Sequence, residues 1–440
     1  MIWVILLLAF ILRLVNINQS LWLDEAAQIL MSQRSLYSII FERSNDFHPP
    51  LSYLMSHLWL MLGSSEIWLR LLPVIFGVGT VFIIYKLCQK LFDEKIALIS
   101  ALLLSTAPYH VYYSQEIRMY SIAAFFASLS MYFFITNKKM GYVLSTAALL
   151  YTHYMGAFLL VAQFIYKRNW NFLGLVLLTY LPWLPFLMTQ LQNGVKADQY
   201  LPGWSDLLSI DPIKAIPLTF IKFSVGRINI EDIYLYGVVA LVIFGFYGLL
   251  LLKSLNDKVT KIVWYWLGIP LISAWLISFI LPMNQPFRLL FTIPAFYILL
   301  AVGINKLGKY WKLGLLGVLL ISITGLFIYW TNPKFHREDW RAATNEIPAN
   351  VIFAWPVPFD PYIWYGGKGK GVVRHFPANK DEVSKSMGLL GNLSEVYFFE
   401  YLQTLSDPNK EIQTWLTENG YVLIKTLNYN GVGLIYKYTK

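Results

Sequence analysis

Long apolar segments recur through most of this chain, and they constrain its fold more than any other feature. Backbone polar groups find no water inside a bilayer, so a crossing segment must be a helix of about 20 apolar residues. Of the 440 residues, 57% are hydrophobic and 14% are charged. We therefore expect a polytopic α-helical membrane protein with about eleven spans. The candidate spans lie at about 1–16, 67–88, 95–112, 117–136, 141–152, 154–166, 172–190, 232–252, 261–281, 285–305 and 312–330.

Three of these segments are unusual. The runs at 141–152 and 154–166 are short, and we interpret them as a broken or tightly bent helix pair. The first run, 1–16, has no basic residues before it and no small-residue cleavage site after it. A cleaved signal peptide needs both a basic start and such a cleavage site, so we expect a retained anchor.

The basic residues of the short loops predict the orientation. If the N-terminus is cytoplasmic, every lysine-rich short loop falls on the cytoplasmic side, as the positive-inside rule requires. The net charge of +10 is then a topogenic signal, and no nucleic-acid partner is needed to explain it. An odd number of spans places the C-terminus outside, in a multi-pass plasma-membrane protein. The loop residues are Lys86, Lys90, Lys95, Lys138, Lys139, Lys167, Arg168, Lys253, Lys258, Lys261, Lys306, Lys309 and Lys312.

Three regions are expected on the extracytoplasmic side. The first outer loop, about 17–66, contains an apolar stretch of about 14 residues that suits a helix lying at the interface. Pro49 and Pro50 suit its start, because proline is tolerated in a first turn. The third region is everything after residue 330. The second, 191–231, carries Asp198, Asp206, Asp211, Lys214, Lys222 and Arg227.

The C-terminal region differs in composition from the rest. We divide the chain into a transmembrane domain, 1–330, and a small soluble α/β domain, 331–440, which is long enough for its own core. A second helix there has Asp407 as its N-cap, Pro408 at its first position and Asn419-Gly420 as its stop. The first helix is expected at 338–346 and strands at 351–355, 372–376, 395–400, 421–426 and 433–438.

The acidic pair Asp24-Glu25 stands in the first outer loop. Adjacent helical residues point about 100° apart, so the two carboxylates cannot share one role. One could act as a base toward a cleft while the other makes a structural bond or caps the helix. Alternatively, both could solvate the N-terminus of an interfacial helix, where negative charge suits the helix dipole.

Further polar residues interrupt the apolar runs near their outer ends. Glu116 and Arg118 lie beside Tyr120, where the alternative to a site is an interfacial aromatic belt with a local ion pair. Arg288 could snorkel or could grip a phosphate with its bidentate fork. Arg13 lies inside the first span, against the topology rule. His48 and His153 are lone histidines, which more often pack than catalyse.

Several function classes lack their motifs. The chain has no DxD, no P-loop and no GxSxG, which argues against a metal-bound nucleotide-sugar donor, ATP chemistry and a serine hydrolase. Its single cysteine, Cys88, excludes an intrachain disulfide framework. The histidines form no HExxH pair, so a zinc site is not expected.

Eight short motifs occur in an order that resembles a known family. They are LRL, LWLDEA, HPPLSYL, SSEIWLRLLPVIFG, YHVYYSQEIRMYS, YTHYMG, PFRLLFTIP and, after the last span, REDWRAA. Together they resemble the GT-C glycosyltransferases of the dolichyl-phosphate-mannose-protein mannosyltransferase type, in their bacterial branch. The lipid A aminoarabinose transferases are relatives of that family. The resemblance covers about residues 1–305 and extends weakly to the last motif.

The resemblance implies roles for individual residues. In that family the sugar arrives on a polyprenyl phosphate, and an acidic residue of the first outer loop is catalytic. Asp24 then becomes the base that takes the acceptor proton, and Glu25 helps to place the substrate. Since the lipid phosphate is already a good leaving group, cations that stabilise it matter more than a strong acid. The implied substrate-binding residues are Arg13, His48, Glu116, Arg118, Tyr120, His153 and Arg288, with no metal cofactor.

The resemblance therefore predicts an enzyme that moves a sugar from a polyprenyl-phosphate donor to an acceptor on the extracytoplasmic face. The acceptor could be a protein, a lipid or a cell-wall glycan, and membrane lipids surround the enzyme. The main alternative is a transporter or flippase of lipid-linked sugars. A transporter is expected to show matched halves with broken helices and charges at mid-span, and the sequence shows neither. A third hypothesis is that the protein is a structural or accessory subunit.

Overall fold

The computed structural model describes residues 1–42, 47–196, 203, 209–255, 257–281, 283–389 and 393–440. Its contacts divide the chain into two compact units. The membrane unit comprises Met1–Ile17, Leu36–Gln190 and Ser209–Phe335. The C-terminal unit comprises His336–Lys440 together with Asn18–Ser35 and Leu191–Leu208. The predicted division at residue 330 placed Asn18–Ser35, which contains the acidic pair, with the membrane helices. In the structure this segment belongs to the C-terminal unit. Asp198 and Asp206 lie outside the described residues.

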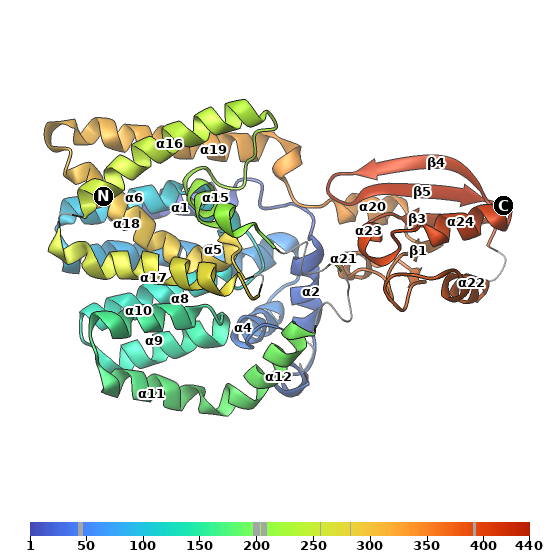
Figure 1. Cartoon of the computed structure of the whole chain (residues 1–440), viewed down its shortest axis with the longest axis horizontal. Helices are drawn as coiled ribbons and strands as arrows, with labels where there is room; N and C mark the ends of the chain where they lie inside the picture. The colour runs from blue at the N-terminus through green and yellow to red at the C-terminus, as the bar shows by residue number, and fades with distance from the viewer. Residues whose placement is uncertain (43–46, 197–202, 204–208, 256, 282, 390–392) are drawn as a thin grey trace. The chain divides into compact units, whose positions relative to one another are not determined.

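The membrane unit consists of helices (Figure 1). Helix α12 begins in this unit, and its residues from Leu191 on belong to the C-terminal unit. A 3-10 helix, η3, precedes α18. The α-helices are α1 (Ile2–Leu14), α3 (Leu36–Phe41), α4 (Leu51–Leu60), α5 (Glu66–Leu91), α6 (Glu94–Thr106), α7 (Pro108–Ser114), α8 (Tyr120–Ile135), α9 (Lys139–Thr152), α10 (Gly156–Tyr166), α11 (Trp170–Tyr180), α12 (Leu184–Val195), α15 (Pro212–Val225), α16 (Ile233–Ser254), α17 (Lys261–Ile277), α18 (Ile293–Asn305) and α19 (Trp311–Thr331); the 3-10 helices are η1 (Leu181–Trp183), η2 (Lys258–Thr260), η3 (Pro286–Thr292), η4 (Gly308–Tyr310) and η5 (Pro333–Phe335).

The predicted polytopic membrane fold is confirmed, but the count of eleven spans is not. Within the described residues, six helices are long and apolar enough to cross a membrane, or seven if one bent pair forms a single span. That pair is α6 and α7, and the chain bends by 61° between them, where one straight span, 95–112, was expected. Pro108 begins the second helix, because its missing N–H leaves no bond to continue the first. The runs at 141–166 form two helices, α9 and α10, with a break at His153.

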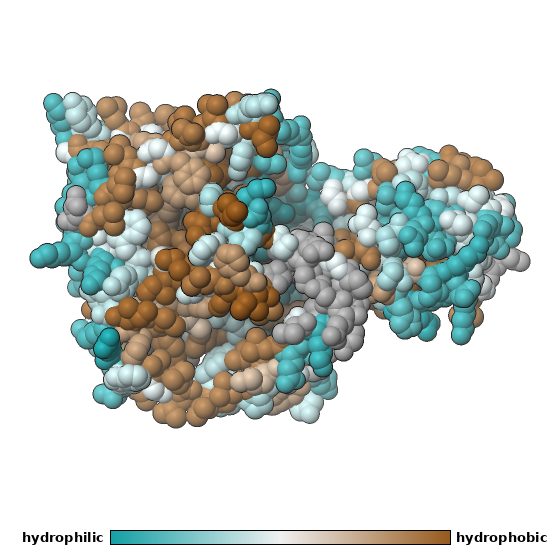
Figure 2. All heavy atoms as spheres, in the orientation of Figure 1, coloured by the Kyte–Doolittle hydropathy of each residue, from teal (hydrophilic) through white to brown (hydrophobic). Residues whose placement is uncertain are grey.

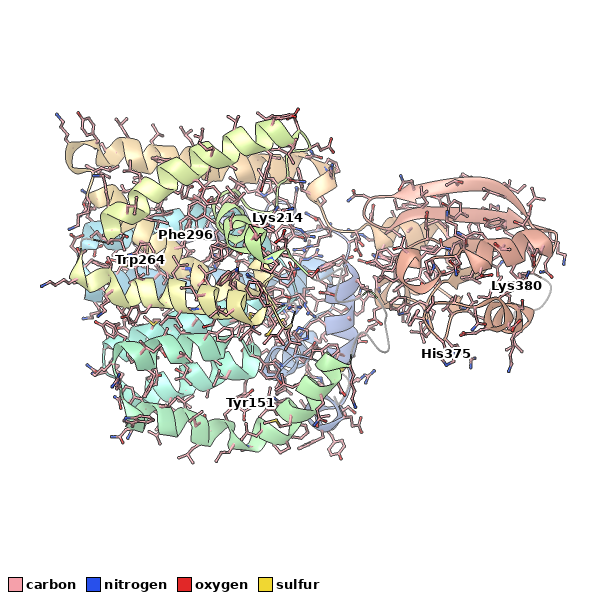
Figure 3. The ribbon with its side chains drawn as sticks, in the orientation of Figure 1. Tyr151, Lys214, Trp264, Phe296, His375 and Lys380 are labelled. Carbon is pink, nitrogen blue, oxygen red and sulfur yellow. The ribbon has the colours of Figure 1, made fainter. Side chains whose placement is uncertain are left out.

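Helix α18 lies at the centre of the membrane unit. All its residues from Ile293 to Ile304 are buried, and α6, α16, α17 and α19 pack around it. Phe296, labelled in Figure 3, is buried in this packing and stacks on Tyr247 of α16, with ring centroids 6.0 Å apart. Gly303 lets α16 approach closely, because an added Cβ would stand 2.0 Å from the Leu250 carbonyl oxygen.

The outward faces of the peripheral helices are apolar. Leu241 of α16 is 75% exposed, and Phe327 of α19 is 61% exposed. Figure 2 shows such hydrophobic side chains over much of the visible face of this unit. In a water-soluble unit such surface would be costly, whereas a bilayer solvates it with lipid tails.

The lysine-rich loops contact one another at helix ends. The Lys95 ammonium lies 4.3 Å from the Trp311 ring, which links the α5–α6 turn to the start of α19. These contacts bring several of the basic turns together, and the side of the membrane on which they lie stays a prediction. The other links are Lys306 to Asp257 at 3.3 Å, Lys167 to Asn137 at 3.0 Å, and the Tyr166 ring to the Tyr265 ring at 6.1 Å.

The predicted small α/β domain is confirmed by a five-stranded sheet in the C-terminal unit, in the order β2-β1-β3-β5-β4. Strand β1 pairs in parallel with β2 and β3, while β5 pairs antiparallel with β3 and β4. The strands are β1 (Val351–Phe353), β2 (Gly369–Gly371), β3 (Glu395–Phe399), β4 (Val422–Tyr429) and β5 (Gly433–Thr439); the helices are α2 (Leu23–Ser32), α20 (Trp340–Glu346), α21 (Asp360–Trp364), α22 (Lys380–Gly388), α23 (Gln403–Ser406) and α24 (Glu411–Glu418).

Two details of this unit differ from expectation. The strand predicted at 372–376 is instead β2, which ends at Gly371; the apolar signal came from buried residues after it. Helix α24 begins at Glu411, after Lys410 in the left-handed region, and not after Asp407. The Asp407 carboxylate still caps this helix, because it accepts bonds from the backbone N–H groups of Glu411 and Ile412. Pro408 therefore lies before the helix.

Candidate active site

The predicted site residues fall into two sets, one in each unit. His48, Glu116, Arg118, Tyr120, His153, Arg288 and Arg13 belong to the membrane unit, and Asp24 and Glu25 belong to the C-terminal unit.

Aromatic rings assemble the first set. Tyr120 begins α8, after the turn that follows α7, and its ring packs edge-on against Tyr113 of α7 at 5.4 Å. It also contacts the Phe287 ring of η3 at 5.2 Å and the His153 ring at 6.0 Å. Residues far apart in sequence thus converge because α7, α8, η3 and the α9–α10 break meet at one place.

Cationic groups surround these rings. Arg118 Nη2 lies 3.5 Å from His48 Nε2, and the Arg288 guanidinium lies 5.9 Å from the Phe287 ring centroid. His153 is close enough to His48, Arg118 and Arg288 for all three charges to act on it. Met155 N–H donates to His153 Nδ1 at 3.3 Å, which makes that nitrogen an acceptor. We call His48, Arg118, Tyr120, His153 and Arg288 the cationic cluster.

Glu116 acts on the same tyrosine as Arg227, a residue that sequence reasoning did not single out. Glu116 is buried, and its charge acts on Tyr113, as does the charge of Arg227. Arg227 is exposed, donates to the Tyr112 hydroxyl and stacks on the Tyr112 ring. It reaches this position because Gly226, at φ +87°, passes Pro108 so closely that a Cβ would meet its side chain. No local signal distinguished Arg227 from the other charges of its loop.

Arg13 makes a different set of contacts. It is fully buried, and its guanidinium donates to the carbonyls of Ala9 and Ser105 and to His110 Nδ1, at 2.7 to 3.1 Å. Gln115 Nε2 donates in turn to the Arg13 carbonyl at 2.9 Å. These bonds join α1 to α6 and α7, so the structure shows Arg13 in helix packing. Its substrate-binding role stays a prediction.

The acidic pair lies in the first turn of α2. Glu25 is fully buried, and its Oε2 lies 3.7 Å from the Nε atom of Arg337, itself almost completely buried. Asp24 is partly exposed. The 100° between adjacent helical side chains therefore puts the two carboxylates into different environments.

A third carboxylate, Glu338, approaches the same helix end. Its Oε2 accepts from Leu23 N–H at 3.2 Å and from Trp340 Nε1 at 2.7 Å, and its Oε1 accepts from the Tyr401 hydroxyl at 2.8 Å. Burial raises the pKa of Glu338 against the lowering effect of these bonds, and the charge of Asp24 raises it further. Glu338 stands in the REDW motif, but nothing in the sequence indicated its partner.

The described residues contain no group of three His, Cys, Asp or Glu side chains placed to hold a metal ion. Cys88 is buried beside Ser100, with 3.5 Å between Sγ and Oγ. The site offers carboxylates, guanidinium groups and imidazoles, and independence from metals stays a prediction.

Comparisons with known proteins bear on this arrangement. Residues 47–188 match the model of the dolichyl-phosphate-mannose-protein mannosyltransferase family. That segment includes His48, Arg118 and His153 of the cationic cluster. Among curated proteins, none matches the chain by sequence.

Solved structures share the fold over nearly the whole chain. ArnT from Cupriavidus metallidurans, bound to undecaprenyl phosphate, has a TM-score of 0.59 at 11% identity, covering 99% of this chain and 96% of that one. The oligosaccharyltransferase AglB from Archaeoglobus fulgidus, in complex with an inhibitory peptide and a dolichol-phosphate, has 0.54 at 12% identity, covering 99% and 74%. Likeness at such low identity establishes the fold. This chain is therefore a multi-pass membrane protein with the fold of these GT-C glycosyltransferases, and its residues 47–188 match the model of the dolichyl-phosphate-mannose-protein mannosyltransferase family.

Proposed function

We propose that this protein transfers a sugar from a polyprenyl-phosphate donor to an acceptor on the extracytoplasmic face, with Asp24 as the general base. The observation that carries the proposal is the convergence of His48, Arg118 and Arg288 on one aromatic cluster of the membrane unit. Two relatives in fold were solved with a polyprenyl phosphate, undecaprenyl phosphate in ArnT and dolichol-phosphate in AglB.

The cations suit the phosphate of such a donor. As the bond between the sugar and the phosphate breaks, negative charge grows on the phosphate oxygens. Arg118 and Arg288 offer planar, permanently charged guanidinium groups that can bind two oxygens at once. Aromatic faces such as those of Tyr120 and Phe287 commonly pack against sugar rings and prenyl chains. The cluster therefore supplies charge and apolar surface together.

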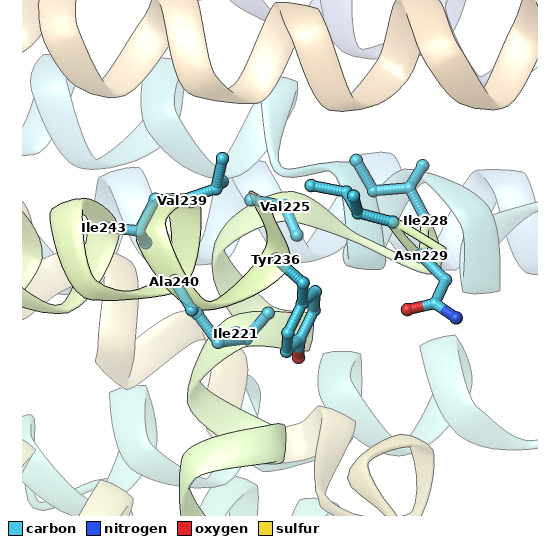
Figure 4. Close-up of a pocket in the computed structure, with 9 residues that line it drawn as sticks. Ile221, Val225, Ile228, Asn229, Tyr236, Val239, Ala240 and Ile243 are labelled. Atoms are coloured by element: carbon cyan, nitrogen blue, oxygen red, sulfur yellow. The ribbon is translucent and has the colours of Figure 1, made fainter. Parts of the chain in front are cut away.

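A small apolar pocket of the membrane unit, of about 30 Å³, lies next to the residue that follows Arg227. It lies between α15 and α16 and in the chain between them, with a lining that is almost entirely apolar (Figure 4). Arg227 directly precedes the lining residue Ile228, and it contacts Tyr112 beside the cationic cluster. An arginine beside apolar surface suits the phosphate end of a lipid donor, while the pocket itself is too small to hold the prenyl chain. The lining residues are Ile221, Val225, Ile228, Asn229, Ile230, Tyr236, Val239, Ala240 and Ile243.

The chemical step needs one base. The acceptor oxygen attacks the anomeric carbon, the bond from that carbon to the phosphate oxygen breaks, and polyprenyl phosphate leaves with the electron pair. The acceptor proton passes to the Asp24 carboxylate. Glu25 suits this role less well, because its charge already pairs with Arg337 inside the C-terminal unit.

The direct test is sugar transfer in proteoliposomes. Purified wild type, Asp24→Asn and Asp93→Asn would receive radiolabelled polyprenyl-phosphate sugars and a membrane extract as the source of acceptor. Loss of the base should lower turnover by about 10²–10⁴-fold. Asp93→Asn is the matched control, because Asp93 caps α6 and asparagine caps a helix equally well.

The outcomes separate the alternatives. Full transfer by Asp24→Asn would remove Asp24 as the base. Movement of labelled donor across the bilayer without transfer to any acceptor would favour a transporter of lipid-linked sugars. Transfer that survives EDTA supports a metal-free reaction, and loss of transfer contradicts it.

The proposed orientation has its own test. Lys385→Cys in the C-terminal unit and Lys90→Cys at the end of α5 are both exposed positions, whereas the natural Cys88 is buried. A membrane-impermeant maleimide applied to intact cells should label Lys385→Cys and spare Lys90→Cys until the cells are opened. The reverse pattern would overturn the orientation.

A further inference from the structure

The first turn of α2 is capped by a residue from a distant part of the sequence. Its N-cap residue, Trp22, makes no side-chain capping bond. Instead, Glu338 Oε2 accepts from Leu23 N–H at 3.2 Å. The four N–H groups at the start of a helix have no partner within it, so such a bond stabilises the turn. Leu23 directly precedes Asp24, so Glu338 holds the backbone that carries the proposed base.

Glu338 is itself held from two further sides. Trp340 Nε1 donates to the same oxygen at 2.7 Å, and the Tyr401 hydroxyl donates to the other oxygen at 2.8 Å. Trp340 is fully buried and stacks on Phe399 of β3, with centroids 5.9 Å apart. The carboxylate therefore has one fixed position, tied to the core of the sheet.

We propose that Glu338 is a positioning residue for the transfer reaction: it fixes the first turn of α2, and with it the direction of the Asp24 carboxylate. This inference rests on the proposed function of Asp24. In this role Glu338 neither touches the substrate nor transfers a proton.

The charges around Glu338 support a role beyond simple packing. Asp24 repels both Glu338 and the ionised form of Tyr401. Glu25, on the same turn, is neutralised by Arg337. A neutral acceptor at position 338 would cap Leu23 without repelling Asp24, so a carboxylate here costs stability. Such a cost is typical of sites where placement of a reactive group matters.

The test compares two substitutions that differ in one property. Glu338→Gln keeps an acceptor oxygen for Leu23 N–H, whereas Glu338→Ala removes it. Because a displacement of about 1 Å can cost about 100-fold in rate, Glu338→Ala should lower kcat by 10-fold to 100-fold and leave the KM for donor within about 2-fold. Glu338→Gln should recover most of kcat. Glu400→Gln is the control, since Glu400 also accepts from a tyrosine, Tyr436, at 2.8 Å.

A second measurement does not depend on activity. Hydrogen exchange of the α2 amides should accelerate in Glu338→Ala and stay near the wild-type rate in Glu338→Gln and Glu400→Gln. Unchanged exchange in Glu338→Ala would overturn the proposal, as would equal losses of kcat in the alanine and glutamine variants. A wild type that transfers no sugar would refute the proposed function instead, while the exchange data would still decide whether Glu338 holds α2.

Discussion

Glu25 and Arg337 form a buried ion pair, with 3.7 Å between Oε2 and Nε and side chains 0% and 2% exposed. Glu25 belongs to α2, and Arg337 lies just after the last membrane helix. The pair joins α2 to the segment that leads into the sheet, which accounts for the place of Asn18–Ser35 in the C-terminal unit.

Breaking this pair should destabilise the C-terminal unit strongly. Glu25→Ala leaves the Arg337 charge buried beside an empty space, and the loss of one partner of a buried pair costs about 3–5 kcal/mol. We expect a lower midpoint of urea unfolding, followed by the fluorescence of the tryptophans. The double variant Glu25→Ala, Arg337→Ala should lose less than the sum of the two single changes. Strict additivity would show that the two charges do not interact.

Arg288 should act through its shape as well as its charge. The oxygens of a carboxylate or a phosphate can bind two guanidinium nitrogens at once, whereas the lysine ammonium offers only one nitrogen. Arg288→Lys should therefore raise the KM for the polyprenyl-phosphate donor about 10-fold, and Arg288→Ala should raise it further. Arg168→Lys, at an exposed loop position, is the control. Donor saturation curves decide the matter, and an unchanged KM in both Arg288 variants would exclude a phosphate contact.

Gly303 should tolerate no side chain. Its added Cβ would stand 2.0 Å from the Leu250 carbonyl oxygen of α16, so Gly303→Ala has to push two helices apart. Overpacking of this kind typically costs about 1–3 kcal/mol. Gly248→Ala on α16 is the control, because nothing lies within 4 Å of its added Cβ. Thermal unfolding in detergent should show a lower midpoint for Gly303→Ala alone. Equal midpoints would contradict the close approach of α16 and α18.

Glu338 should make stability depend on pH. Burial raises its pKa, so between its ordinary pKa, about 4.3, and the raised value the folded protein binds more protons than the unfolded chain. Its contribution to the free energy of unfolding is therefore greatest at low pH and falls as pH rises through the raised pKa. Glu338→Gln removes this titration, so the variant should gain stability relative to wild type as the pH rises from about 4.3 through the raised pKa. Urea unfolding across that range tests it, and a constant difference would refute it.

Much of the fold could be predicted because its signals are local. Apolar runs predict membrane helices, because a segment that crosses a bilayer must be a helix of limited length and apolar composition. Pro49-Pro50 predicted the start of α4, which begins at Leu51, and Gly420, at φ +82°, stops the helix before it. The bend at Pro108 was not predicted, because the apolar run at 95–112 continues through it. The start of α24 was predicted too early, because an aspartate signal marks a boundary only within a few residues.

The sequence by itself determined the membrane class, the gathering of basic turns and the order of motifs that indicated a glycosyltransferase. Only the tertiary structure decided that Glu25 is buried on Arg337, that Glu338 caps the helix of Asp24, and that Arg227 reaches Tyr112. The reason is physical. Length and hydropathy act through neighbours in the chain, whereas burial and charge pairing depend on residues that only folding brings within a few ångströms.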